Sequence, residues 1–555
     1  MKRILLAATA LLLAAIACGP TAPTPTSVPQ TTQSPTPQPA ISSPQFTISV
    51  EYAILGVAEE YAAAGITYAK LQDAFIIWGN IEPEPGKYEW GPLDALVLEY
   101  QQAGFTGLQM DFAALSPWAS SVPPALGVAP KDVNTFPKEE YLGEYVAYVS
   151  AVVERYDHDG VDDMPGLLYP IHDYGVEREF TGYWPGTAEE YVRLLRIAYP
   201  AIKAADSEAH VLLVALLMAD IFDGNPDQAE IESRLQKDAD YMRKSVPEMR
   251  AILAACDAYD IVDFHALANY AEIPLTAQWI RNELNANGCG EKPIWIGDAF
   301  SMSALIGYGG FVPPTPFAPA TLETRDAVVA ALAAVADPAD ANHDAAQAWL
   351  YGEMAIGLVR KIVVSAGSGI LGINLGNMED WKTGIAAADK ASVPMLGASL
   401  FMGMTDTTIT NQEPGGKLPF TGHLWSKARR AGDRRPVWHA LKLVNEKISA
   451  FNSVEKLDPS SLSGQVSAIG IWAYRFEMPT VPVWVLWYDD GNLYLPGQTP
   501  PSVIVQLPFE ATSALLTRTP TAIGQTAPET QILEASGGIL SFDLGATPVF
   551  IEAAQ

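Results

Sequence analysis

Short apolar runs alternate with amphipathic helical stretches over most of this chain, from about residue 45 to residue 451. Runs rich in β-branched and aromatic residues predict strands, and apolar residues that recur every three or four positions predict helices. The clearest helices are predicted over residues 188–205 and 345–365. Eight strands are predicted, over residues 46–52, 66–72, 105–112, 167–179, 210–217, 261–269, 293–299 and 370–375.

Eight strand–helix repeats favour an α/β fold in which a parallel sheet closes into a (β/α)₈ TIM barrel with insertions. A doubly wound open sheet is the alternative, but such a sheet carries a glycine-rich phosphate-binding turn after its first strand. The sequence after residues 46–52 has no such turn. We therefore predict a barrel over residues 45–455.

The pattern changes after Ser461, where helical periodicity ends and short alternating strands are separated by Pro and Gly. This texture predicts a small antiparallel β-sandwich over residues 461–555. Val483, Val485 and Trp487 share one face of a predicted strand, and the residues between them share the other. An Asp-Asp-Gly turn at 489–491 predicts a chain reversal. The strands are predicted over residues 469–476, 483–488, 503–507, 514–517 and 539–544.

The first 44 residues have the pattern of an export signal followed by an extended tether to the folded part of the chain. Residues 1–18 combine Lys2 and Arg3 with an apolar run too short to span a bilayer, and small residues lead into Cys18. This pattern predicts a lipoprotein signal peptide with Cys18 as the lipidated residue; an ordinary signal peptide or an uncleaved anchor helix is the alternative. Residues 19–44 are rich in Pro, Thr, Ser and Gln and predict an extended tether. We expect an extracytoplasmic protein of the cell envelope, held at the membrane only by its lipid.

Charge and cysteine content restrict the partners. The net charge of −30 comes from 64 acidic and 34 basic residues, and such a surface repels nucleic acid and anionic lipid headgroups. Cys256 and Cys289 predict one disulfide in an oxidising compartment, with two buried free thiols as the alternative. No Cys or His grouping has the spacing of a zinc site, so the sequence predicts no metal.

Acidic residues close the fourth and seventh predicted strands, at the end where a barrel builds its active site. Glu177 and Glu179 have the spacing of one strand face, and Asp298 ends the seventh strand. Two carboxylates are the minimum apparatus of most glycosidases. The alternatives are a solvated loop for the glutamates and a loop cap for the aspartate.

Polar and aromatic residues at other strand ends predict the lining of a sugar cleft. His265 and Tyr270 belong to the sixth strand and its end, and Asn377, Asp380 and Trp381 follow the eighth. A place in the core is the alternative for the histidine and for each aromatic ring. The tryptophans predicted to stack on sugars are Trp78, Trp118, Trp184 and Trp381.

Several segments resemble the clan A glycoside hydrolases, in the neighbourhood of families 5, 39 and 42. Residues 75–90 resemble the signature after the second strand of these enzymes, and Asp94 follows on a helix. The resemblance implies a barrel that hydrolyses glycosidic bonds of a poly- or oligosaccharide with two carboxylates and no cofactor. Glu179, or Glu177 if the loop register differs, matches the acid/base, and Asp298 matches the nucleophile. The other resembling segments are residues 115–119, 183–187, 189–191, 201–206 and 292–296.

Four positions depart from the family pattern. Arg178 stands where an asparagine precedes the acid/base, and we predict that it binds substrate, although it cannot accept a hydrogen bond as the asparagine does. Asp298 replaces a glutamate, which retracts the carboxylate and predicts a wider gap between the two acids. Lys70 replaces an arginine, and Leu267 replaces the tyrosine of a His-x-Tyr pair. A catalytically silent carbohydrate-binding protein is therefore the first alternative and a structural envelope protein the second, while the sugar, its linkage and the oligomeric state stay open.

Overall fold

The computed structural model describes most of the chain after residue 40. The described residues are 41–42, 46–121, 135–222, 226–236, 244–267, 269–299, 322–380, 403–462 and 470–554. The lipidation candidate Cys18 and the sugar-stacking candidate Trp381 lie outside them. Within the described ranges, no helix combines the length and the apolar character needed to cross a membrane.

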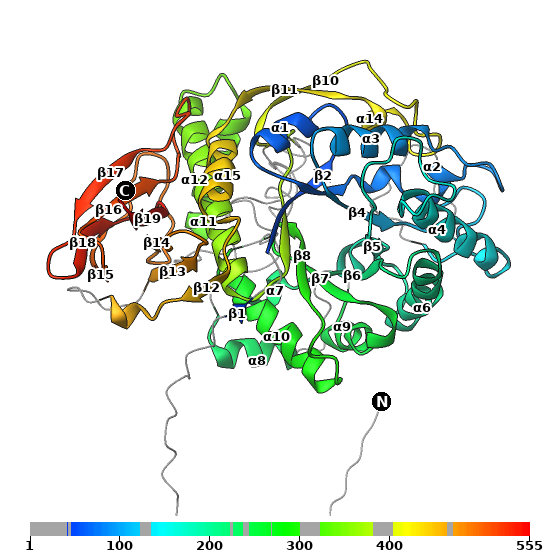
Figure 1. The fold of residues 1–555 in the computed structure, drawn as a ribbon, viewed down its shortest axis with the longest axis horizontal. Coiled ribbons are helices and arrows are strands. Elements are labelled where there is room, and N and C mark those ends of the chain that lie inside the picture. The colour runs from blue at the N-terminus through cyan, green and yellow to red at the C-terminus, as the bar shows by residue number, and fades with distance from the viewer. Residues whose placement is uncertain are drawn as a thin grey trace, which may run out of the picture. The chain divides into compact units, whose positions relative to one another are not determined.

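Eight parallel strands close into a barrel, with the first strand paired to the last (Figure 1). Each observed strand overlaps one of the eight predicted strands, so the predicted TIM barrel is confirmed. The strands are almost entirely buried and most of their residues are apolar, as expected for strands covered by helices on their outer side. The barrel strands are β2 (Thr47–Ala53), β3 (Tyr68–Leu71), β4 (Gly107–Phe112), β5 (Asp173–Val176), β6 (His210–Leu217), β7 (Ile261–His265), β8 (Ile294–Ala299) and β9 (Gly372–Leu375).

Amphipathic helices surround the barrel (Figure 1). The helix α6 (Ala188–Ala205) begins with a capping box, in which Thr187 and Glu190 satisfy each other's backbone N–H groups, and it has the predicted bounds. The other long helices are α3 (Gly91–Gln102), α4 (Leu142–Tyr156), α10 (Glu272–Ala286), α11 (Leu322–Ala336), α12 (His343–Gly367) and α15 (Pro436–Ile448). Shorter elements are α1 (Ala58–Ala63), α2 (Trp78–Ile81), α5 (Phe180–Tyr183), α7 (Ala219–Phe222), α8 (Gln228–Gln236), α9 (Val246–Leu253), α14 (His423–Ser426) and the strand pair β10 (Thr405–Ile409) and β11 (Arg429–Arg434).

The fourth barrel strand is shorter than predicted. Residues 167–172 precede β5 as a connection, and residues 177–179 follow it as a bend. The connection is held by side-chain contacts: Gln101 on α3 accepts from the Leu168 N–H and donates to the Tyr169 carbonyl. Pro170 has no backbone N–H to give to a sheet. The period-two alternation used to place Glu177 and Glu179 therefore does not extend to these residues.

The C-terminal residues form two antiparallel sheets, as predicted for a β-sandwich. The larger sheet has seven strands and the smaller has two, and apolar side chains from both sheets form one core between them. Four of these strands were not predicted: β1, β12, β17 and β19. The large sheet runs in the order β1 (Ile41–Ser42), β12 (Ser453–Lys456), β13 (Ile471–Glu477), β14 (Val483–Tyr488), β19 (Val549–Ala553), β16 (Ser513–Arg518) and β17 (Thr530–Glu534), and the small sheet pairs β15 (Val503–Pro508) with β18 (Ile539–Leu544).

Strand β14 has two buried faces. Val483, Val485 and Trp487 belong to the same core cluster as the barrel, whereas Leu486 belongs to the core between the two sheets. The predicted division of this strand into two faces is therefore correct. The turn after it does not form a hairpin with β15, because β14 pairs with β13 and β19. At this turn the Asp489 carboxylate accepts from the N–H of Gly491, whose φ is +75°.

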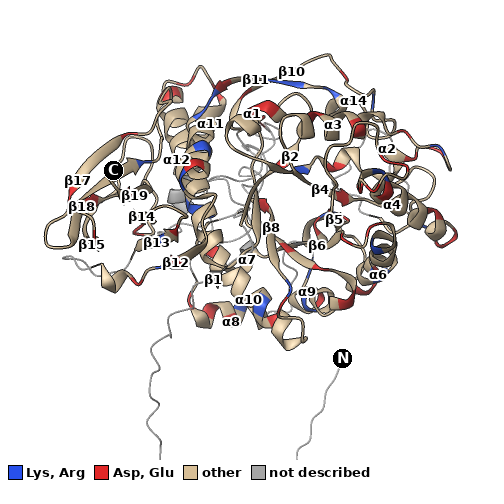
Figure 2. Cartoon of the chain, in the orientation of Figure 1, with Lys and Arg blue, Asp and Glu red and all other residues tan. Residues whose placement is uncertain are grey.

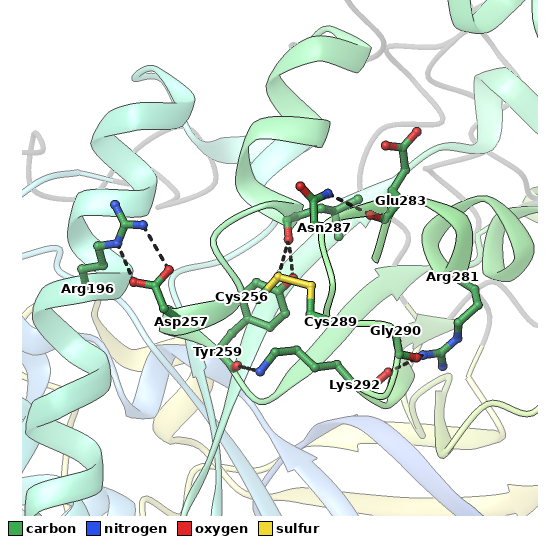
Figure 3. Close-up of a disulfide and its surroundings, with 11 residues drawn as sticks. Arg196, Cys256, Asp257, Tyr259, Arg281, Glu283, Asn287, Cys289, Gly290 and Lys292 are labelled. Carbon is green, nitrogen blue, oxygen red and sulfur yellow. Dashed lines mark hydrogen bonds and ion pairs between the residues drawn. A yellow bond between two sulfur atoms is a disulfide. The ribbon is translucent and has the colours of Figure 1, made fainter. Parts of the chain in front are cut away.

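A disulfide joins Cys256 and Cys289 (Figure 3). Cys256 lies in a 3₁₀ turn before β7, and Cys289 lies between α10 and β8, so the bond ties the entries of two neighbouring barrel strands. Around it, Asp257 pairs with Arg196 of α6, with both oxygens at 3.0 Å. The disulfide therefore stands at the end of the barrel opposite the C-terminal strand ends.

We expect removal of this disulfide to destabilise the protein without changing its chemistry. The two cysteines are 33 residues apart, and a loop of this length corresponds to a loss of about 2–4 kcal/mol in the free energy of unfolding. Denaturant unfolding of the Cys256→Ser, Cys289→Ser double variant measures this loss. Addition of a reductant should lower the stability of the wild type to that of the variant and leave the variant unchanged; a reductant effect on the variant would contradict the assignment.

Candidate active site

Three titratable side chains meet at the C-terminal ends of the barrel strands. His265 Nδ1 lies 2.5 Å from Glu179 Oε1 and 3.8 Å from Asp298 Oδ2. One ligand atom of each residue lies within 4.8 Å of those of the other two. All three side chains are more than 90% buried. The structure therefore brings together both residues matched to the catalytic acids, with an imidazole between them.

The barrel topology explains this meeting. His265 is the last residue of β7, Asp298 lies near the end of β8, and the two are register partners across the strand pair. Glu179 comes from the other side of β6, where it is the N-cap residue of the short helix α5. Parallel strands end on the same side of a barrel, so residues far apart in sequence converge there. The shorter side chain of Asp298 has not separated the acids beyond 4.8 Å.

The charges around His265 favour its protonated form. Burial lowers the pKa of this imidazole, but the carboxylates of Glu179, Asp298 and Asp263 outweigh burial and raise the pKa to about 9. At neutral pH the proton therefore resides on the histidine. The site then holds a cationic imidazolium in contact with Glu179.

Glu177 points elsewhere. Its Oε1 accepts from the N–H of Ala114, just beyond β4, at 2.6 Å, and among the described residues its Oε2 has no hydrogen-bond partner. The side chain is fully buried, and its φ of +66° turns the chain between β5 and α5. This turn gives Glu177 and Glu179 different surroundings, which corrects the expectation that they share one face. Burial raises the pKa of Glu177 to about 8.

We expect Glu177→Gln to stabilise the protein at alkaline pH. The wild-type carboxyl has a pKa raised from 4.5 to about 8 on folding, so the folded state retains a proton that the unfolded state releases. The free energy of unfolding should therefore fall as pH rises from 4.5 to about 8, by several kcal/mol, and the amide should remove this part of the fall. Denaturant unfolding at both ends of this range measures it. An unchanged pH dependence in the variant would show that the carboxyl is already ionised in the folded protein.

Lys70, Glu51 and Asp111 form a buried ion-pair network on three neighbouring barrel strands. Of these three residues, only Lys70 was singled out from the sequence. Lys70 Nζ on β3 lies 3.1 Å from Glu51 Oε1 on β2 and 3.0 Å from Asp111 Oδ2 on β4. Burial opposes the charge of Lys70, but Asp111 and Glu51 raise its pKa above the ordinary value. Glu51 and Asp111 could have been found from the sequence, because each is the one acidic residue of a buried strand. Burial raises the pKa of Glu51 well above its ordinary value despite the lysine.

Asp263 is a third unpredicted acid in the barrel. It lies on β7 two residues before His265, is fully buried, and accepts from the Gly297 N–H at 2.8 Å. A Cβ atom on Gly297 would stand 1.9 Å from Asp263 Oδ2, so only glycine leaves room for this carboxyl. Burial raises the pKa of Asp263 to about 7, although His265 and Lys70 lower it.

Arg178 contacts two residues outside the cluster of Glu179, His265 and Asp298. Its guanidinium forms an ion pair with Asp73 at 3.2 Å and lies over the Tyr183 ring, 5.6 Å from the centroid. Asp73 belongs to the 3₁₀ turn after β3. The arginine therefore connects the turn after β3 with the bend after β5. The prediction that Arg178 binds substrate stays a prediction.

Tyr270 was predicted to line the sugar site, but the structure places it against the C-terminal sheets. Its hydroxyl donates to Asp489 and accepts from the indole N–H of Trp487 at 3.2 Å. Its ring meets Trp472 and Trp487 edge-on and lies beneath Arg360 of α12. The loop after β7 carries it toward the sandwich, so it holds the sandwich to the barrel rather than contacting sugar.

Trp78 packs in the core, and Trp118 packs against it while remaining partly exposed. Trp78 is completely buried, stacks on Tyr148 and donates its indole N–H to Glu82 at 2.7 Å. Trp118 meets it edge-on and donates to the Glu82 carbonyl at 3.0 Å. Buried indoles satisfy their N–H in this way. The complete burial of Trp78 corrects the prediction that its ring stacks on sugars, whereas the same prediction for Trp118 stays a prediction.

Trp184 is one of the residues that line a cavity. It is 2% exposed, donates its indole N–H to the Thr187 carbonyl at 2.9 Å and packs edge-on against Tyr191. The cavity, of about 340 Å³, lies between the segments that follow β4 and β5 and is also lined by Phe136 and Arg193. Its lining does not include the three residues of the carboxylate–histidine cluster. Trp184 therefore lines the cavity but is otherwise almost completely buried.

The residues after β9 form structural contacts. Asp380 makes a two-oxygen ion pair with Arg435 and accepts from the Gly403 N–H. Asn377 is buried and donates to the Glu379 carbonyl at 2.8 Å. Figure 2 shows a run of basic residues along β11 in an otherwise strongly acidic chain. Acidic side chains form ion pairs with these basic residues, as Glu379 does with Arg429. Asp380, paired with Arg435, therefore belongs to a network of ion pairs rather than to an open sugar site.

One solved structure has a comparable architecture over nearly the whole chain. A family 39 glycoside hydrolase from the gut symbiont Bacteroides cellulosilyticus WH2 superposes with a TM-score of 0.51 and 13% sequence identity, over 92% of this chain and 81% of that one. The chain has the fold of a family 39 glycoside hydrolase. The resemblance to clan A noted in the sequence is confirmed at the level of the fold.

Two other glycoside hydrolases superpose on this chain with lower TM-scores. A family 51 α-L-arabinofuranosidase from Bifidobacterium longum gives a TM-score of 0.49 at 12% identity, over 94% of this chain and 97% of that one. A monomeric β-xylosidase from Caulobacter crescentus CB15 gives 0.48 at 14% identity, over 92% and 95%. No protein-family model and no curated protein sequence matches the chain.

Proposed function

We propose that this protein is a retaining glycoside hydrolase that cleaves O-glycosidic bonds in a poly- or oligosaccharide. The observation that carries the proposal is the approach of Glu179 and Asp298 to within 4.8 Å at the C-terminal ends of the barrel strands. Retaining glycosidases hold their two carboxyl groups about 5–5.5 Å apart, and inverting enzymes about 6.5–9.5 Å. The short separation supports retention. The fold shared with a family 39 glycoside hydrolase is consistent with the same reaction class.

In the proposed reaction, Asp298 is the nucleophile and Glu179 the acid/base. Asp298 attacks the anomeric carbon and forms a glycosyl ester while the glycosidic bond breaks, and Glu179 protonates the departing oxygen. Glu179 then takes a proton from water, which attacks the same carbon and releases the sugar.

His265 supports the proton transfers. Its imidazolium touches Glu179 at 2.5 Å and holds a proton at neutral pH. It replaces the proton that Glu179 gives to the leaving oxygen and takes it back after water has been deprotonated. The same nitrogen lies 3.8 Å from Asp298 Oδ2, so the imidazolium lies beside the proposed nucleophile as well. His265 is therefore a positioning and proton-holding residue in this proposal.

Hydrolysis of a panel of aryl glycosides and oligosaccharides by the full chain tests the proposal. We expect release of sugar with retained anomeric configuration, observed by NMR before mutarotation, and loss of release in the Glu179→Gln, Asp298→Asn double variant. Glu446→Gln, which removes an exposed carboxylate on α15, is the matched control. Inverted product would remove the assigned role of Asp298. Binding of saccharides without hydrolysis would instead favour the catalytically silent carbohydrate-binding protein.

We further propose that the protein is a cell-envelope lipoprotein anchored through Cys18. The support is the apolar leader, the small residues before Cys18 and the charge-poor tether after it. The disulfide between Cys256 and Cys289 suits an oxidising compartment. Mass spectrometry of the mature N-terminus tests the anchor: a diacylated Cys18 is expected, and Cys18→Ser should release the protein from the membrane fraction. An unmodified N-terminus at another residue would refute it.

A further inference from the structure

The contact between Glu179, His265 and Asp298 has the composition of a metal site. It joins one imidazole nitrogen to two carboxylates, on three chain segments that the barrel holds in place. We propose that these three residues bind one first-row divalent cation, such as Zn²⁺, in competition with the glycoside. The inference concerns the residues of the proposed function but does not require that the protein hydrolyse a glycoside.

The distances suit such a cation after small movements. Zinc binds histidine nitrogen and carboxylate oxygen at about 2.0–2.2 Å, so two ligand atoms in a tetrahedral site stand about 3.4 Å apart. His265 Nδ1 lies 3.8 Å from Asp298 Oδ2 and 2.5 Å from Glu179 Oε1, and all three atoms lie within 4.8 Å of one another. Shifts of about 1 Å would bring them to coordination distance and leave a fourth position for water or a substrate oxygen.

Asp263 occupies the place of a supporting carboxylate. Metal-binding histidines usually donate their other ring N–H to a carboxylate, which fixes the tautomer and the ring orientation. His265 Nε2 lies 4.0 Å from Asp263 Oδ1, and neither Nε2 nor Asp263 Oδ2 has a hydrogen-bond partner among the described residues. A cation on Nδ1 would leave the imidazole proton on Nε2, facing this carboxylate. At 4.0 Å from Asp263 Oδ1, this N–H would form the hydrogen bond only after a shift of about 1 Å.

The charge of the surrounding barrel also favours a cation. Glu51, Asp111 and Asp263 add three buried carboxyl groups in the same barrel, and Glu51 and Asp111 share the cation Lys70. A divalent ion would add compensating positive charge. Among the described residues, the buried acids of this region include Glu51, Asp111, Glu179, Asp263, Glu272 and Asp298, and the basic groups whose charge acts on them include Lys70, His265 and Lys361.

Co²⁺ titration of the full chain, purified with a chelator, tests the site without relying on activity. We expect saturable visible d–d absorption at one Co²⁺ per chain, displaced by Zn²⁺. Glu179→Gln and Asp298→Asn should each weaken binding at least tenfold, and Asp263→Asn by about 10–100-fold. Far- and near-UV circular dichroism checks that the variants are folded; the first two change one atom of a carboxylate and keep its shape.

Two control variants separate this site from other carboxylates. His210 Nδ1 lies 3.0 Å from Asp173 Oδ1, a pair of the same type without the second carboxylate, so His210→Asn should leave the spectrum unchanged. Asp159→Asn tests the acidic loop that holds Asp157, Asp159 and Asp163, whose oxygen-only ligands would give weaker bands. Absence of bands, or bands that survive Glu179→Gln and Asp298→Asn, would overturn the proposal.

The metal inference and the glycosidase proposal can fail separately. A chain that binds Co²⁺ but hydrolyses no glycoside loses only the proposed function. A chain that hydrolyses glycosides and gives no spectrum loses only the metal site. If both hold, Zn²⁺ should raise the apparent KM of hydrolysis and leave kcat unchanged, because the cation occupies the space between nucleophile and acid/base.

Discussion

Asp298→Asn is expected to reduce hydrolysis of every cleaved glycoside to the background rate, whereas Glu179→Gln should spare substrates whose leaving group needs no proton. An amide at position 298 cannot form the glycosyl ester, so no choice of substrate restores the first step. The glutamine at position 179 removes general acid catalysis, which is worth about 10²–10⁴-fold for a poor leaving group such as an alcohol. Activated aryl glycosides depart without protonation and should lose far less in that step.

Steady-state kinetics on an alkyl and a nitrophenyl glycoside of the same sugar separates the two roles. For Glu179→Gln, the ratio of the two kcat/KM values should shift by about 10²-fold or more towards the nitrophenyl substrate. For Asp298→Asn both values should fall together. Equal losses in the two variants would contradict the division of roles, and a full effect in Glu446→Gln would show that the losses arise from general destabilisation.

Lys70→Met should be the most destabilising single exchange at the buried network. Lys70 lies 3.1 Å from Glu51 and 3.0 Å from Asp111, with side chains less than one-tenth exposed. Methionine fills a similar volume but leaves Asp111 as a buried charge without its cation. Removing one partner of a buried ion pair costs about 3–5 kcal/mol in the free energy of unfolding.

Denaturant unfolding with two further variants tests this reason. Adding Glu51→Gln and Asp111→Asn to Lys70→Met removes the orphaned charges and should recover most of the loss, because a neutral network of similar shape is often as stable as the ionic one. Lys87→Met breaks the exposed pair with Glu84, whose side chains are 68% and 66% exposed, and should cost less than about 1 kcal/mol. A triple variant as unstable as Lys70→Met would show that packing, not charge, explains the loss.

The barrel could be predicted from the sequence because its strands are short apolar runs separated by periodic helices. The limits of the prediction appear where tertiary contacts override that pattern. Residues 167–172 are apolar enough to resemble a strand, yet Gln101 holds part of them as a connection. β17 was missed because Thr530, Gln531 and Ile532 are exposed at the sheet edge and lack a clear alternation.

The acids at strand ends could also be predicted, but their surroundings could not. The sequence marked Glu179, Asp298 and His265 by position, and the closed barrel brings them within 4.8 Å of one another. It did not show that Glu177 turns away, since that depends on a backbone φ of +66°. Tyr270 was misplaced because its partner Asp489 is 219 residues away, in a domain whose packing no local pattern specifies.

Because both faces of β14 are buried, the C-terminal sheets are an integral part of the barrel's packing rather than a separable module. Trp487 and Val485 belong to the same apolar cluster as the barrel, and Leu486 on the reverse side belongs to the sandwich. A chain that ended before this strand would lose the contact between Arg360 of α12 and Asp489. It would also leave the Tyr270 hydroxyl without its hydrogen bonds to Asp489 and Trp487. The two parts must therefore fold as one cooperative unit, and recombination that exchanges the sandwich alone would have to rebuild both surfaces of a single strand.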